Sequence, residues 1–192
     1  SSAASDVYKR QLKCSNGKEA KSSEKTWFPI VKGGNFRKWY GNQETVINWA
    51  DGGHELKELI TARYGSPSKR IVNERSYFLP GVTYSSAGGD SLSFRITSNS
   101  LFAVSGPMLT MPEHLLPITA ACLNSSSFRL FAEITTPGMN TRNGVLAKLP
   151  APISDIDSGS KCGKIADECI SLSKRDYDSQ ETSWDFKRNP LI

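Results

Sequence analysis

The sequence predicts an α+β fold, in which a twisted, mostly antiparallel sheet carries short helices on one side and a helical extension follows. Two observations lead to this prediction. Short apolar runs, several of them alternating with polar residues, lie between turns that contain glycine and proline across residues 26–152. Apolar residues at helical spacing occur within that region and again after residue 160.

The strand patterns are short. Residues 82–84 and 92–97 lie on either side of a glycine-rich turn at residues 85–90, which predicts a β-hairpin. Aromatic and β-branched residues favour the other strands. Strands are expected at residues 27–31, 35–40, 46–49, 82–84, 92–97, 101–104, 107–111 and 145–149.

Four segments have the spacing of amphipathic or buried helices. Gly65 is placed to end the first of them, and Pro117 is placed to open or kink the second. The expected helices cover residues 55–64, 114–123, 126–134 and 161–173.

The length of 192 residues allows one domain with appendages. Residues 1–11 differ in character from the rest of the chain and look like a translated sequencing adapter, so we exclude them as an extraneous scar. Residues 12–25 are polar and are expected to form a flexible lead-in. We expect one folded domain at residues 26–152 and a helical extension at residues 153–192.

The charge balance favours an anionic partner, because 24 basic and 19 acidic residues give a net charge of +5. No apolar run approaches the roughly 20 residues that a membrane span needs, so we expect a soluble protein with no membrane partner. We interpret the four cysteines as reduced thiols of a cytoplasmic protein. The four cysteines match no zinc pattern, and the two histidines have no partner at helical spacing. We therefore expect no metal and no catalytic residues.

Residues 27–49 combine cations, paired glycines and aromatic rings, a mixture that is typical of nucleic-acid contacts. Flexible backbone amides and basic side chains together suit phosphate groups, and flat rings suit bases. The alternative is a hairpin whose aromatic residues form core and whose lysines are solvated. The candidate DNA-contacting residues in this run are Lys32, Gly33, Gly34, Arg37, Lys38, Trp39 and Tyr40.

Two other places carry candidate base or phosphate contacts. Arg95 falls on the polar face of the hairpin strand, where an ordinary solvated arginine is the alternative. The polar loop at residues 135–144 would expose Asn140, Arg142 and Asn143, whose side chains suit bidentate contacts. An ordinary turn rich in asparagine explains that loop equally well.

Several motifs occur in the same order as in one known protein family. The chain reads FPIVKGGNFRKWYGN, VINW, YFLPGVTYS, LSFRI, LLPITAACLNS, TTPGMNTRNG and LAKLP, followed by the tail SKRDYDSQETSWDFKRNPLI. Over residues 26–192 this resembles the target-recognition region, and the segment after it, of adenine-specific DNA methyltransferases of the BREX phage-exclusion type (PglX-like). It is similar more loosely to the specificity domains of fused restriction and modification enzymes.

The resemblance implies that this chain is a fragment of a methyltransferase that uses S-adenosylmethionine. It also implies that residues 26–152 are a DNA target-recognition domain and that the helical extension at residues 153–192 is truncated. In such enzymes a doubly wound catalytic domain binds the cofactor and flips an adenine into a pocket with an Asn/Asp-Pro-Pro-Tyr/Phe motif. That motif does not occur here, and the glycine pairs at residues 33–34 and 88–89 do not lie in an expected strand-to-helix turn. We therefore expect no cofactor in this fragment and no catalysis by it alone.

The implied function is sequence recognition for adenine (N6) methylation in a phage-defence system. The expected partners are double-stranded DNA, the missing methyltransferase domain and other proteins of the defence system. One alternative is a protein-interaction module that docks on defence partners through Trp184 and Phe186. A nuclease or hydrolase is the third interpretation, and it lacks a carboxylate and histidine cluster or a metal pattern to support it.

Overall fold

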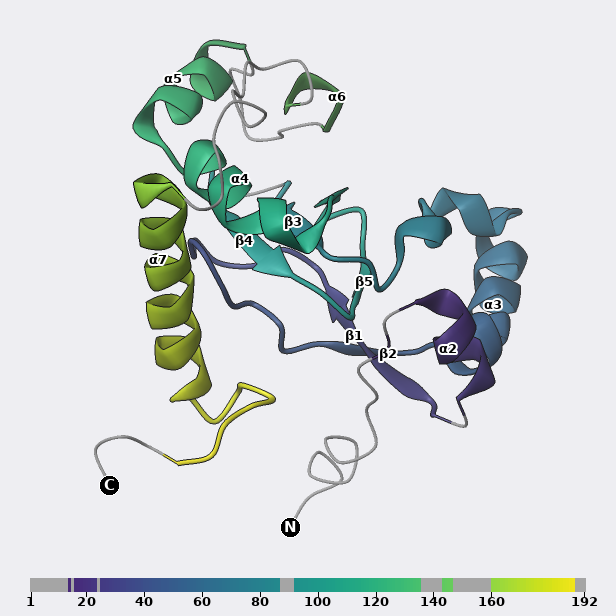
Figure 1. Ribbon diagram of the computed structural model, residues 1–192. Coiled ribbons are helices and arrows are strands. Elements are labelled where there is room, and N and C mark those ends of the chain that lie inside the picture. Colours follow the sequence, from purple (N-terminus) through teal and green to yellow (C-terminus); the bar gives the residue numbers. More distant parts are fainter. Residues whose placement is uncertain are drawn as a thin grey trace.

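The α+β class predicted from the sequence is confirmed by the computed structural model, which describes residues 14, 16–23, 25–86, 92–135, 143–146 and 160–188 (Figure 1). Its strands form two three-stranded sheets with the orders β2-β1-β5 and β4-β3-β6, rather than one continuous sheet. The strands are β1 (Trp27–Val31), β2 (Val46–Asn48), β3 (Gly81–Tyr84), β4 (Phe94–Thr97), β5 (Leu101–Phe102) and β6 (Met108–Thr110).

Strand β1 changes partner halfway along its length. Its first half pairs antiparallel with β2, with Phe28 opposite Ile47, and its second half pairs parallel with β5, with Ile30 opposite Leu101. In the other sheet β3 is central and antiparallel to both neighbours. The predicted hairpin is confirmed, since β3 and β4 pair with Val82 opposite Ile96.

The expected strand at residues 35–40 does not form. Only Trp39 reaches a sheet, where its N–H donates to the Phe94 carbonyl and its carbonyl accepts from Ile96, both at 2.9 Å. The backbone of Trp39 has φ 72°, and the φ angles of Gly33 and Gly34 are also positive. An extended strand requires negative φ, so the chain here follows an irregular path.

The predicted helices are confirmed with small shifts of their ends. Gly65 ends α3 in the left-handed conformation, its N–H donating to Thr61, and Pro117 lies in the first turn of α4. The described helices are α2 (Gly17–Ser22), α3 (His54–Tyr64), α4 (Leu116–Leu123), α5 (Ser126–Thr135), α6 (Asn143–Leu146) and α7 (Lys161–Asp178). Short 3-10 turns lie at Ala50–Gly52, Pro67–Lys69, Glu74–Ser76 and Glu113–Leu115.

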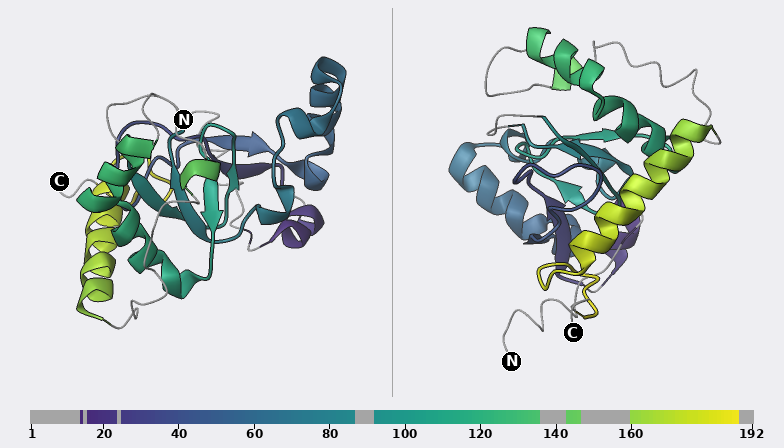
Figure 2. Two further views of the ribbon diagram at one scale, coloured as in Figure 1. Left: turned by 90° about the horizontal axis from the view of Figure 1, so that it is seen from above. Right: turned by 90° about the vertical axis from the view of Figure 1, so that its left-hand side faces the viewer.

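The helices lie at two ends of the molecule. Helix α4 contacts β3 and β4, and α7 packs against α4, whereas α2 and α3 lie beside the β1–β2 end (Figures 1 and 2). Helix α7 runs the length of the side that faces the viewer in the right-hand view of Figure 2. No described helix is long and apolar enough to cross a membrane.

Two further sequence predictions are wrong in local structure. Residues 145 and 146, expected in a strand, belong to helix α6, and residues 147–149 lie outside the described part. The lead-in at residues 12–25 was expected to be flexible. Instead it contains α2, whose first turn is capped where the Asn16 side chain accepts from Glu19 N–H at 2.9 Å, and its Cys14 and Ala20 are fully buried.

The described core consists of two clusters, one for each sheet. Beside β1 and β5, the Tyr77 ring packs edge to face on Trp49 and Phe102, with centroids 5.3 and 5.0 Å apart. Beside β3 and β4, Phe94 packs on Phe128 of α5 at 5.8 Å. The second cluster therefore fixes α4 and α5 against the hairpin, which positions the start of α5.

Gly106 supports the junction between the sheets, because a Cβ there would lie 2.4 Å from Gly33 N and 2.8 Å from Lys32 C. These are backbone atoms that cannot rotate away. We expect Gly106→Ala to lower the free energy of unfolding by about 1–3 kcal/mol. Gly17→Ala is the control, since nothing lies within 4 Å of its added Cβ. Urea unfolding of both variants checks this, and equal stabilities would contradict it.

Alkaline pH is expected to destabilise the fold. Burial raises the pKa of Tyr77, Tyr84 and Tyr177 to about 12 each. Because these folded-state pKa values are raised, the stability they contribute is complete below about pH 10 and is lost as pH rises toward about 12. Burial lowers the pKa of Arg95 to about 10, and this shift alone would make the fold more stable as pH rises, which opposes the effect of the three tyrosines.

Urea unfolding at about pH 9 and about pH 11 measures this loss. The Tyr177→Phe variant is expected to lose less stability over the same interval, because it removes one of the raised phenols. A free energy of unfolding that stays constant or rises between the two pH values would contradict the prediction.

Candidate nucleic-acid interface

Residues 32–42, here called the double-glycine segment, run over the hairpin and are held by neighbouring loops. Ser105 donates its hydroxyl to the Lys32 carbonyl and Ser85 donates to the Gly34 carbonyl, both at 2.8 Å. Gly33 is buried, and a Cβ there would lie 2.8 Å from the Ser105 carbonyl oxygen. Because its φ is also 89°, only glycine suits this position. Lys32 beside it stays exposed.

Arg95 lies beneath this segment with no exposed surface, so the expectation that it projects to solvent is wrong. Its Nη1 donates to the Arg37 carbonyl and its Nη2 to the Ser85 hydroxyl, both at 3.3 Å. The physical reason is that α4 packs against β4, while the double-glycine segment runs along the edge of β4 and brings the Arg37 carbonyl to the guanidinium. An alternating pattern indicates one solvent-facing side only when nothing packs there.

The Arg95 guanidinium is desolvated without an ion pair to any carboxylate of the described residues. Burial, with a smaller contribution from the Arg37 charge, lowers the pKa of Arg95 to about 10. It still keeps its proton at neutral pH. Its long hydrogen bonds and full burial make it a support for the segment above it, and its side chain is out of reach of a nucleic acid in this conformation.

Arg37 and Tyr40 contact α7. The Arg37 guanidinium is 3.2 Å from the Asp176 carboxylate and lies 5.2 Å from the centroid of the Tyr177 ring. Tyr40 packs edge to face on Tyr177 at 5.9 Å. The Ser173 hydroxyl donates to the Lys38 and Tyr40 carbonyls at 3.0 and 3.2 Å. These contacts join the helical extension to the double-glycine segment.

A small notch of about 90 Å³ lies where the segment meets the start of α5. Lys38 donates from Nζ to the Asn124 carbonyl at 3.2 Å and lines the notch together with Arg129. Phe36 borders it with 59% of its surface exposed. Ser125 Oγ accepts from Phe128 N–H at 3.1 Å, which caps the first turn of α5.

The notch has the chemistry of an anion site. Its lining contains two cations, while the first-turn amides of a helix carry partial positive charge toward its N-terminus. Arg129 is also 3.5 Å from Glu133, an exposed pair that contributes little. The Asn124 side chain exchanges hydrogen bonds of 3.0 and 2.9 Å with the backbone of Phe94, so the notch is fixed to β4.

The structure thus places Lys38 in the notch, leaves Lys32 exposed, and assigns Arg37, Trp39 and Tyr40 to contacts within the fold. Asn140 and Arg142 lie outside the described residues, and Asn143 begins α6 with its side chain not described. The sequence analysis missed Phe36, Arg129 and the serines that open α5. The run Ser125 to Ser127 before an apolar helix is a capping signal that would have pointed to this place.

A second group of exposed cations lies at the far end of the molecule. The guanidinium carbons of Arg63 and Arg70 lie 5.5 and 4.7 Å from the centroid of the Tyr64 ring, and Lys69 is next to them in sequence. This group provides a comparison of similar charge for tests of the notch. The described residues contain no group of three or more histidine, cysteine or acidic side chains that is placed to hold a metal ion.

The buried Arg95 yields a stability prediction. Arg95→Met removes a desolvated charge while filling most of its volume, so we expect a change within about 1 kcal/mol. Arg95→Ala leaves a cavity and is expected to cost about 2–4 kcal/mol. Urea unfolding compares the two variants. If methionine destabilises the protein as much as alanine does, then the hydrogen bonds of the guanidinium contribute more to stability than the filling of the cavity does.

No known family profile matches this chain. It is 33% identical over 171 residues to the adenine-specific methyltransferase PglX of Lacticaseibacillus casei (strain Zhang), a match that covers 88% of this chain and 14% of that protein. It is 29% identical over 170 residues to the adenine-specific methyltransferase BrxX of Escherichia coli O9:H4 (strain HS), covering 86% and 13%. The predicted resemblance is confirmed: the chain is homologous to a part, about one seventh in length, of PglX-like adenine-specific methyltransferases.

Proposed function

We propose that this chain is the DNA-recognition portion of a site-specific adenine (N6) DNA methyltransferase of a phage-defence system, acting on double-stranded DNA in the cytoplasm. Its two relatives are adenine-specific methyltransferases, and the chain corresponds to a small share of each. In this proposal the remainder of the parent enzyme carries out the transfer, and other proteins of the defence system are its further partners.

The parent enzyme would take its methyl group from S-adenosylmethionine, and the residues described here do not fit that cofactor. Phosphate and nucleotide groups are commonly held by a glycine turn that leads from a strand into a helix. Gly33 and Gly34 follow strand β1, but they lead into the irregular double-glycine segment. Gly52 and Gly53 lie between β2 and α3, but β2 is an edge strand that pairs antiparallel with β1, unlike the parallel strands of a doubly wound nucleotide-binding sheet. No part in binding the cofactor is therefore assigned to the described residues.

The notch at the start of α5 is the observation that carries the proposal. It combines Lys38, Arg129 and helix N–H groups in a space of about 90 Å³, beside the exposed ring of Phe36. Cations and helix N-termini contact the phosphates of DNA, and such contacts set the register of a protein on the duplex. An exposed ring next to them is placed to stack on a base or to wedge at a base step.

The sequence-predicted residues take distinct roles in this proposal. Lys32 and Lys38 contact phosphates, and Gly33 and Gly34 permit the path that presents them. Arg37, Trp39, Tyr40 and Arg95 hold the segment in place through the contacts described above. Asn140, Arg142 and Asn143 remain the proposed readers of base edges.

The backbone of Trp39 is consistent with a functional segment. A non-glycine residue at φ 72° costs about 1–3 kcal/mol, and such positions concentrate at sites where the fold imposes a geometry. Here two hydrogen bonds to β4 impose it. They fix the position of Lys38, the residue directly before Trp39.

DNA binding tests the proposal. Lys38→Gln combined with Arg129→Gln removes two phosphate contacts, so we expect about tenfold or greater weakening and a salt slope smaller by about two. The matched control is Arg63→Gln combined with Lys69→Gln, which removes the same charge at the other end. Fluorescence anisotropy with a labelled duplex across a salt series measures both quantities, and thermal melting confirms that both variants are folded.

Two results would contradict the proposal. One is an absence of duplex binding by the native chain at low salt. The other is an equal loss of affinity in the notch variant and the control variant, because equal losses would reflect net charge rather than a located site.

A further inference from the structure

A larger groove lies on the other side of the double-glycine segment, between the sheets and the helical extension. Its volume is about 540 Å³, within the range of sites that bind small ligands or peptide side chains. The floor is apolar and comes from four elements, with Pro29 of β1, Ile96 of β4, Leu116 of α4 and Ile170 of α7. The rings of Tyr40 and Trp184 also line it.

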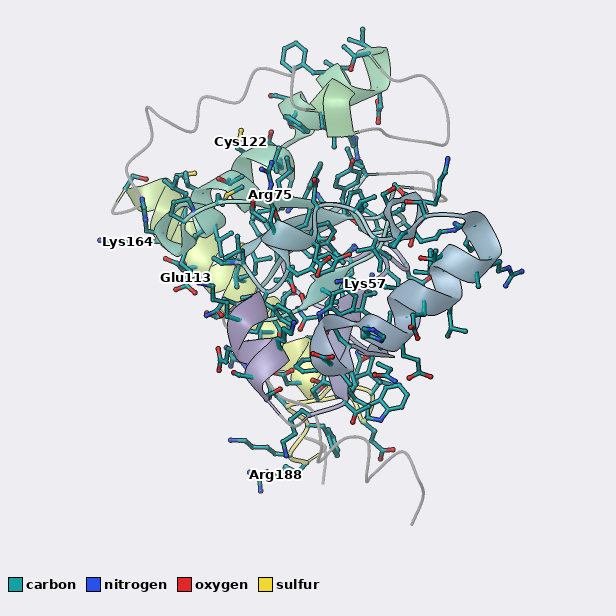
Figure 3. All side chains as sticks on the ribbon, turned by 90° about the vertical axis from the view of Figure 1, so that its right-hand side faces the viewer. Lys57, Arg75, Glu113, Cys122, Lys164 and Arg188 are labelled. Carbon is teal, nitrogen blue, oxygen red and sulfur yellow. The ribbon has the colours of Figure 1, made fainter. Side chains whose placement is uncertain are left out.

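All of the charged residues that line this groove are acidic. They are Glu113 before α4, Asp167 on α7 and Asp185 in the segment after α7. Glu113 and Asp167 are exposed, and Figure 3 shows Glu113 beside α7. Neither of these two carboxylates forms an ion pair with a described lysine or arginine.

Lys174 contacts two of the residues that line the groove, Tyr40 and Asp185, and it is already paired. Lys174 donates to Asp178 and to Asp185, the latter at 3.0 Å, and its Nζ lies 4.8 Å from the centroid of the Tyr40 ring. Burial alone lowers the pKa of Lys174, but the hydrogen bonds that it donates to these two carboxylates raise the pKa overall. One lysine therefore pairs with two carboxylates, and the groove keeps an excess of negative charge from Glu113 and Asp167.

This combination selects a particular kind of ligand. An arginine side chain has an apolar shaft that suits the floor, and its planar guanidinium pairs with carboxylates and stacks on aromatic faces. A phosphate backbone is disfavoured, because it would meet three carboxylates. The acidic groove therefore suits a different kind of partner from the one that the basic notch suits.

We propose that this groove is a docking site for a basic peptide segment of a partner protein, which inserts an arginine side chain between Tyr40 and Trp184 toward Glu113 and Asp167. Charge complementarity and the apolar floor support this occupant. The site does not depend on the proposed DNA contacts, because none of its lining residues lies in the notch.

Peptide binding tests the proposal. The probe is a fluorescein-labelled hexapeptide with two arginines, and its control has citrulline, the uncharged isostere, in place of each arginine. We expect the arginine peptide to bind the native chain at least tenfold more tightly than the citrulline peptide at low salt. The variant Glu113→Gln combined with Asp167→Asn is expected to bind the arginine peptide at least fivefold more weakly.

The matched control is Asp51→Asn combined with Glu58→Gln, which changes the net charge equally at exposed positions near α3. It is expected to bind the arginine peptide like the native chain. Equal binding of the two peptides, or equal losses in the two variants, would overturn the proposal. So would self-association of the native chain that the groove variant abolishes, since the occupant would then be a second copy.

Discussion

The buried guanidinium of Arg95 is the constraint on which the surface of this protein depends. It lies in the sheet beneath residues 32–42 and donates to the Arg37 carbonyl and to Ser85, which in turn holds the Gly34 carbonyl. The segment above has almost no ladder hydrogen bonds of its own. Its path is therefore fixed from below by Arg95 and Trp39, and from outside by Arg37, Tyr40 and helix α7.

Holding this segment in place creates two surfaces of opposite charge. On one side Lys38 and the start of α5 form a basic notch beside an exposed phenylalanine. On the other side Tyr40 closes an acidic groove with Trp184 of the segment after α7. The helical extension is thus integral to the arrangement. Under the two proposals above, each surface would repel the ligand of the other, which would add selectivity.

The sequence predicts the fold class, the β3–β4 hairpin, the length of α3 with its Gly65 cap, and the pair α4 and α5, because periodicity and capping are local signals. The sequence pattern predicts the wrong exposure for Arg95. Alternation along β4 cannot show that Arg37, 58 positions earlier in the chain, lies against the polar side of the strand. The sequence pattern fails for Arg37 for a similar reason, because Asp176 lies 139 residues away. The notch joins residues from three segments, and no local pattern identifies it.

Backbone amide chemical shifts of the isotopically labelled chain, followed by NMR during titration with a short duplex DNA, test the central claim most directly. The account predicts that the largest changes occur at Gly33, Gly34, Phe36 and Lys38 and in the first turn of α5. Changes confined to the end of α3 around Tyr64, with those amides unmoved, would contradict it.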